Sequence, residues 1–108
     1  MSLRISALAL LVPDYDAAIA WYTEKLGFEL LEDTGLAPDK RWVRIAPPGD
    51  QGAALVLAKA ATPAQTARIG DQTGGRVFLF LATSDFERDH AAMLARGVAF
   101  RERPRVEP

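Results

Sequence analysis

The order of apolar and polar residues predicts a strand followed by a helix at the start of the chain. Residues 4–12 form a short, almost continuously apolar run that ends at Pro13-Asp14, as is typical of a buried strand leading into a helix. Asp14 is the expected N-cap of that helix. Gly27 is its expected end, because a left-handed residue commonly closes a helix. The apolar stripe of this helix consists of Tyr15, Ala18, Ile19, Tyr22 and Leu26.

Three further strands are predicted between this helix and residue 60. They are residues 28–32, 41–46 and 53–59. Gly35 and Pro38-Asp39 separate the first two of these strands, and a run rich in Pro and Gly separates the last two. The first half of the chain therefore predicts a βαβββ unit.

The same order of elements begins again in the second half. The apolar run 76–82 predicts a strand, and Ser84 and Glu87 form a capping box at the start of a second helix. Gly97 is expected to close this helix before residues 98–100 resume a strand. The stripe of the second helix consists of Phe86, His90, Met93 and Leu94.

Equivalent positions in the two halves indicate an internal repeat. The caps Asp14 and Ser84 are 70 residues apart, and so are the closing glycines Gly27 and Gly97. In this register the chain stops at the counterpart of Pro38, before the counterparts of two strands of the first unit. We therefore expect a shortened form of a longer protein. The alternative is a natural variant with an open sheet edge, which favours aggregation.

A chain of 108 residues is expected to form one domain. In the segment that joins the two units, Thr62 is suited to cap a short helix that begins at Pro63, and Gln72 is a candidate polar contact. The predicted parts of the domain are a first module (1–60), a linker (61–74) and a partial second module (75–108).

Composition narrows the class of function. Hydrophobic residues make up 49% and charged residues 25% of the chain, as in ordinary globular proteins, and no apolar run is long enough for a membrane span. The formal net charge of −1 argues against a nucleic-acid partner, which requires a clustered basic surface. Cysteine is absent, so the chain has no thiolate metal ligand or cysteine nucleophile. Without a recognisable signal peptide, a cytoplasmic location is expected.

Several segments resemble the vicinal-oxygen-chelate superfamily, which includes glyoxalase I, bleomycin-resistance proteins and extradiol dioxygenases. Residues 11–22 (LVPDYDAAIAWY) and 25–28 (KLGF) resemble its opening strand and helix. Residues 41–49 (RWVRIAPPG) and 74–80 (GGRVFLF) resemble one glyoxalase-like branch. The resemblance implies an α+β fold in which paired βαβββ modules form a half-open barrel, with the second module incomplete here. The concave face of such a barrel holds the substrate.

The resemblance also allows a test for the family's metal site, which four side chains normally provide. The first ligand position falls on Ala7, and Leu55 and Leu57 are the expected facing positions of the fourth strand. The third position falls near residues 76–78, which include no histidine or carboxylate, and the fourth lies beyond the chain. Divalent metals need imidazole, carboxylate or thiolate donors. No metal ligand or other cofactor is therefore predicted, and a divalent metal held partly by residues outside this segment is the alternative.

The four candidate ligand-binding residues are Arg76, Phe78, Trp42 and Arg44. Arg76 alternates with Phe78 and Phe80 along one face of a predicted strand, where a guanidinium above aromatic rings would suit a flat anionic molecule. The competing interpretation is an edge arginine exposed to solvent. Trp42 and Arg44 share a face of another strand and would add a stacking wall and a second cation. A purely structural role for Trp42 is the alternative.

His90, the only histidine, invites assignment as a general acid or base. Its position between Phe86 and Met93 on the inner stripe of the second helix favours packing instead. No catalytic residue is therefore predicted.

The leading hypothesis is a homodimeric protein that binds a small molecule in a concave cavity without the usual metal. The alternative is a metal-dependent lyase or dioxygenase of the glyoxalase type, and a structural or regulatory partner domain is a third possibility. The sequence identifies neither the ligand nor a reaction.

Overall fold

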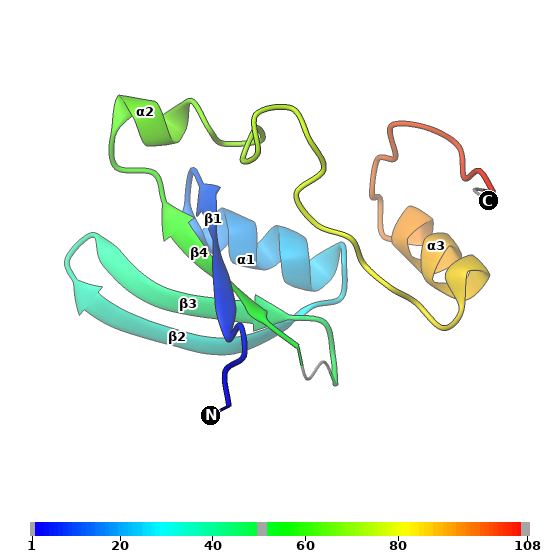
Figure 1. Ribbon diagram of the computed structural model, residues 1–108, viewed down its shortest axis with the longest axis horizontal. Helices are drawn as coiled ribbons and strands as arrows, with labels where there is room; N and C mark the ends of the chain where they lie inside the picture. Colours follow the sequence, from blue (N-terminus) through cyan, green and yellow to red (C-terminus); the bar gives the residue numbers. More distant parts are fainter. Residues whose placement is uncertain (1, 50–51, 107–108) are drawn as a thin grey trace.

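The computed structural model describes residues 2–49 and 52–106 and has an α+β architecture built around one four-stranded sheet (Figure 1). Helix α1 covers one face of the sheet, and α3 lies to one side of it (Figure 1). None of the helices in this part of the chain is long and apolar enough to cross a membrane. The elements are β1 (Ala7–Val12), α1 (Tyr15–Glu24), β2 (Glu29–Ala37), β3 (Lys40–Ala46), β4 (Ala54–Lys59), α2 (Pro63–Thr66) and α3 (Phe86–Ala95).

The strands lie in the order β1-β4-β3-β2, with β1 parallel to β4 and the other neighbours antiparallel. The sheet is not closed, and its layout fits the predicted half-open barrel. Strand β2 is longer than the predicted 28–32, because Gly35 does not end it but pairs with Arg41 inside the β2–β3 hairpin. The register of that hairpin shifts twice, between Leu30 and Glu32 and between Gly35 and Ala37.

The hydrophobic core lies between the sheet and α1. Val43 and Ile45 of β3 have 0% exposure, and they pack in one cluster with Tyr15 and Ala18 of α1. Because successive side chains of a strand point to opposite faces, Trp42 and Arg44, which alternate with Val43 and Ile45 along β3, face away from α1. We call the face of the sheet opposite α1 the open face.

The predicted strands 76–82 and 98–100 are not strands in the structure. A strand needs a neighbour that accepts its backbone hydrogen bonds, and all four strands of the described sheet come from residues 7–59. Phe78 and Leu79 still pack against the core cluster, whereas Phe80 is 87% exposed. The second half thus contributes one long helix and an extended segment.

The helix caps confirm one prediction and correct another. Asp14 caps α1, because its carboxylate accepts a hydrogen bond from the Ala17 backbone N–H at 2.8 Å. Asp85, not Ser84, caps α3 by accepting from the Arg88 N–H at 3.1 Å. Helix α1 ends at Glu24, two residues before Leu26, the last position of its predicted stripe.

Both closing glycines occupy the left-handed region expected of them. Gly27 has φ 75° and Gly97 has φ 90°. The observed N-caps lie 71 residues apart rather than 70, while these glycines keep the predicted spacing. In the linker, Thr62 caps α2 as predicted, accepting from the Gln65 N–H at 3.1 Å.

Candidate functional site

Three polar or aromatic side chains meet on the open face of the sheet. Trp42 and Arg44 lie on β3, and Glu32 of β2 pairs with Arg44 across the hairpin. Trp42 Nε1 donates a hydrogen bond to Glu32 Oε1 at 3.0 Å, and Arg44 Nε donates to the same oxygen at 2.9 Å. The structure therefore brings together the two predicted residues of this strand through a carboxylate that the sequence did not single out.

The Glu32 carboxylate is held in its charged form. The hydrogen bond from Arg44 has the largest effect and lowers the pKa of Glu32. Desolvation, the next largest effect, raises the pKa, and the Trp42 hydrogen bond and the Arg44 charge lower it. The side chains of Arg44 and Glu32 keep 33% and 41% of their exposure. The group is therefore ordered, ionised and accessible.

The surface beside this group is made of small apolar side chains. Val56 of β4 pairs with Arg44, and Ala9 of β1 pairs with Val56, so the three residues lie in one row across the sheet. Ala58 lies on the same face of β4 by strand alternation. Small side chains next to Trp42 leave room for a flat molecule to lie against the sheet.

Glu32 was not predicted as a site residue, and its face depends on the register of the hairpin, which the sequence analysis did not assign. Ala37 pairs with Lys40 at the turn, and continuing without a break would put Asp33 opposite Arg44. The register shift between Gly35 and Ala37 moves Glu32 into that position instead. A slip of one residue exchanges the two faces of a strand.

The other two predicted binding residues do not join this group. Arg76 is exposed, and its backbone carbonyl accepts a hydrogen bond from the Thr73 hydroxyl. Phe78 is partly buried against the core cluster. Both lie in the segment that does not form a strand, so the alternation that would have placed them on one sheet face does not apply. Binding by any of the four residues stays a prediction.

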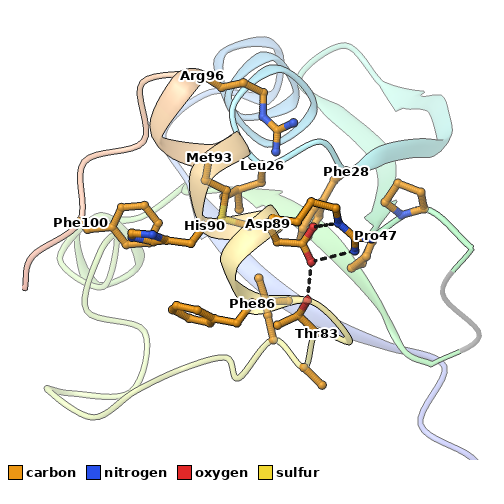
Figure 2. A pocket seen from close by; sticks show the side chains of 14 residues that line it. Leu26, Phe28, Pro47, Thr83, Phe86, Asp89, His90, Met93, Arg96 and Phe100 are labelled. Carbon is orange, nitrogen blue, oxygen red and sulfur yellow. Dashed lines mark hydrogen bonds and ion pairs between the residues drawn. The ribbon is translucent and has the colours of Figure 1, made fainter. Parts of the chain in front are cut away.

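A separate cavity of about 480 Å³ lies between α3 and the first half of the chain (Figure 2). Its apolar walls include Leu26, Phe28 and Met93. On the polar side, the Asp89 carboxylate accepts hydrogen bonds from Thr83 Oγ1 and from Arg88. The Arg88 hydrogen bond, followed by the one from Thr83, lowers the pKa of Asp89. None of the predicted binding residues lines this cavity.

His90 is stacked among aromatic rings at the edge of this cavity. Its ring lies 5.4 Å from that of Phe86 at an interplanar angle of 9°, and 4.7 Å from the ring of Phe100. These contacts agree with the predicted packing role. The side chain also lines the cavity beside α3.

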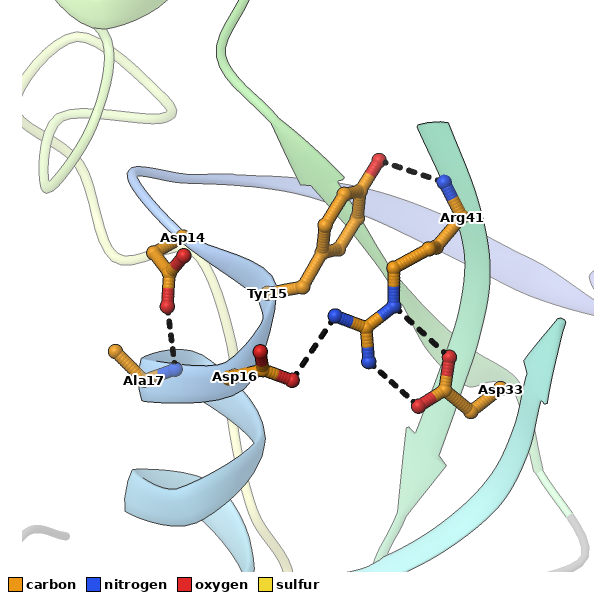
Figure 3. A network of polar contacts seen from close by, with 6 residues as sticks. All are labelled: Asp14, Tyr15, Asp16, Ala17, Asp33 and Arg41. Atoms are coloured by element: carbon orange, nitrogen blue, oxygen red, sulfur yellow. Dashed lines mark hydrogen bonds and ion pairs between the residues drawn. The ribbon is translucent and has the colours of Figure 1, made fainter. Parts of the chain in front are cut away.

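A polar cluster on the α1 side of the sheet positions the strand that carries Trp42 and Arg44 (Figure 3). Arg41 binds Asp33 of β2 through two nitrogens, at 3.1 and 2.6 Å, and Asp16 of α1 at 2.9 Å. Its guanidinium also lies 5.2 Å from the ring centre of Tyr15, whose hydroxyl accepts from the Arg41 backbone N–H. Hydrogen bonds from Arg41 lower the pKa of Asp33. This cluster ties α1 to the hairpin.

The residues at the expected metal positions do not fit a divalent ion. Leu55 and Leu57 point into the core at 5% and 1% exposure, which corrects the prediction that they face the cavity. Val56 and Ala58, which do lie on the open face, have no donor atoms either. Among residues 2–49 and 52–106 no group of three or more histidine, cysteine, aspartate or glutamate side chains is placed to hold a metal.

Comparison with known sequences shows the family. The sequence model of the Glyoxalase/Bleomycin resistance protein/Dioxygenase superfamily matches residues 4–108. The chain therefore belongs to this superfamily. An uncharacterized protein from Shewanella frigidimarina (strain NCIMB 400) is 51% identical over 108 residues, covering 99% of this chain and 80% of the relative. YurT from Bacillus subtilis (strain 168), also uncharacterized, is 29% identical over 107 residues, or 94% of this chain and 81% of that protein.

Solved structures agree with this assignment. The crystal structure of UcmS2 matches with a TM-score of 0.81 and 30% identity, covering 100% of this chain and 85% of UcmS2. A superfamily member from Sphaerobacter thermophilus DSM 20745 matches with a TM-score of 0.75 and 27% identity, covering 99% and 82%. TnmS3, described as an antibiotic binding protein from Streptomyces sp. CB03234, matches with a TM-score of 0.69 and 31% identity, covering 91% and 74%.

Proposed function

We propose that this protein binds a small, flat organic molecule on the open face of its sheet, without a divalent metal. The contact of Trp42 and Arg44 with Glu32 carries the proposal, because it presents an aromatic ring and fixed polar atoms beside a flat apolar surface. The likeness to TnmS3, an antibiotic binding protein, supports binding rather than turnover.

Two of the four predicted residues have a role in this proposal. Trp42, which is 39% exposed, supplies the stacking wall, and Arg44 supplies hydrogen-bond donors. Arg76 and Phe78 have no part in this proposal, because Phe78 packs against the core cluster and neither residue joins the open-face contact. The proposal includes a cytoplasmic location and a homodimer, both of which come from the sequence.

Replacing Trp42 tests the proposed site. We expect the Trp42→Ala variant to bind the neutral probe 2-naphthamide about tenfold more weakly than the wild type, because an aromatic contact contributes roughly 0.5–1.5 kcal/mol beyond area burial. Isothermal titration calorimetry measures the affinity.

Trp21→Ala is the matched control, because Trp21 is 43% exposed but lies on α1, on the other side of the sheet. Its affinity should equal that of the wild type. Equal losses in both variants, or no loss in Trp42→Ala, would contradict binding at the open face.

The family also contains metal-dependent enzymes, so a lyase or dioxygenase of the glyoxalase type is the second candidate. The metal of such an enzyme would be coordinated partly by residues outside this chain segment. Elemental analysis of the purified protein and an assay with the methylglyoxal–glutathione adduct separate the two functions. A stoichiometric divalent metal together with turnover would support the enzyme and overturn the metal-free binding protein.

A further inference from the structure

Trp42, Arg44 and Glu32 form a group on the open face, and the charges of this group bear on the kind of ligand that it accepts. The Arg44 cation is already neutralised by Glu32, to which its Nε donates at 2.9 Å. An arginine commonly binds a carboxylate or phosphate through two parallel hydrogen bonds. Here an anionic ligand would have to displace Glu32 from Arg44 or lie next to its negative charge.

The same group leaves an acceptor on Glu32 and donors on Arg44 without a described partner. Glu32 Oε1 accepts from both Trp42 and Arg44, and no described residue donates to Glu32 Oε2. On Arg44 only Nε is engaged, so no described residue accepts from Nη1 or Nη2. Both side chains are partly exposed, so the pair is accessible to a ligand.

We infer that Glu32 determines specificity at this site, and that the site selects uncharged aromatic molecules with a hydrogen-bond donor next to an acceptor and disfavours organic anions. This inference rests on the proposed function, because it concerns the same open face. It also replaces the flat anionic ligand that the sequence indicated for an arginine above aromatic rings. A neutral amide or similar group can donate to Glu32 Oε2 and accept from Arg44, while its ring lies against Trp42.

A pair of probes with the same ring system tests the inference. 2-Naphthamide is neutral and has a donor beside an acceptor, whereas 2-naphthoate is an anion at neutral pH. We expect the wild-type protein to bind the amide at least about threefold more tightly than the acid. In Glu32→Gln and Glu32→Ala, the loss of the carboxylate charge should reverse this preference, with about a tenfold gain for naphthoate.

Glu24→Gln is the matched control, because it removes the same charge from the exposed surface of α1. It should keep the wild-type preference, and circular dichroism establishes that each variant is folded. A wild type that prefers naphthoate, or Glu32 variants that keep the wild-type preference, would overturn the inference and leave the proposed function standing. If neither probe binds wild type or variants, the proposed function fails, and the inference fails with it.

Discussion

At the scale of single residues, the start of α3 depends on an aspartate that the sequence pattern passes over. The Ser84–Glu87 spacing has the form of a capping box, yet the Asp85 carboxylate accepts from the Arg88 N–H, and the Thr83 hydroxyl accepts from the Asp85 N–H. Both residues are competent caps, so the backbone conformation decides between them. Asp85 has an extended φ of −150°, from which its side chain reaches the first turn.

The effect of removing each candidate cap distinguishes them. Asp85→Ala should lower the free energy of unfolding by about 1 kcal/mol, because the first turn of α3 loses its acceptor. Ser84→Ala should change it by less than about 0.5 kcal/mol, as is usual for a surface substitution. Chemical denaturation followed by far-ultraviolet circular dichroism measures both. A larger loss of unfolding free energy in Ser84→Ala than in Asp85→Ala would show that Ser84 is the cap.

At the scale of elements, the exposed edge of the sheet has an unusual partner. Strand β1 is at one end of the sheet, and Gln72 of the linker bonds to it through both ends of its side-chain amide. Its Oε1 accepts from the Leu11 N–H at 3.2 Å, and its Nε2 donates to the Ala9 carbonyl at 3.0 Å. One side chain therefore occupies the backbone positions that a neighbouring strand would use.

Loss of this amide should expose the edge. We expect Gln72→Ala to increase self-association on mild heating, measured by light scattering, because the freed Ala9 and Leu11 groups become available to another strand. Gln65→Ala is the control, since it also removes a side-chain bond to the backbone, at Ala61, but away from the sheet. Similar behaviour of the two variants would show that Gln72 does not protect the edge.

At the scale of the whole molecule, a short contact joins the first half to α3. Arg96 Nε donates to the Lys25 carbonyl at 2.8 Å, so the end of α3 satisfies a free carbonyl at the end of α1. The two closing glycines lie at this contact, because Gly27 is beside Arg96 and Gly97 is beside Lys25. The repeat seen in the sequence thus brings equivalent helix ends together.

The exposed apolar surface of the second half supports the proposed homodimer. Large hydrophobic side chains there are exposed to solvent, which is typical of surfaces that bind a partner. They are Val77, Phe80, Leu81, Phe86, Leu94, Phe100 and Val106.

Sedimentation equilibrium tests the dimer. The wild-type protein should have twice the mass of one chain, and Phe80→Ser should shift the equilibrium toward monomer because it removes an exposed aromatic ring from the contact. Leu36→Ser, at an exposed position on β2, is the control. A monomeric wild type at every concentration would refute the proposal.

Local patterns in the sequence determined most of the first half. Periodicity and turn residues predicted β1, α1, β3 and β4 to within a few residues, since burial of one face and helix capping act over short distances. The same reasoning correctly placed Trp42 and Arg44 on one face of a strand. The family, which the comparison confirmed, was indicated separately by the resemblance of several segments to known members.

Tertiary structure decided what depends on pairing between distant segments. Residues 76–82 have the composition of a strand, but no strand formed by residues 2–49 or 52–106 pairs with them, so their predicted alternation of faces is not realised. The register shift in the β2–β3 hairpin assigned Glu32 to the open face and Asp33 to the α1 side, where it meets Arg41. A one-residue shift leaves the sequence pattern of each strand unchanged but reverses which side chains lie on the open face of the sheet.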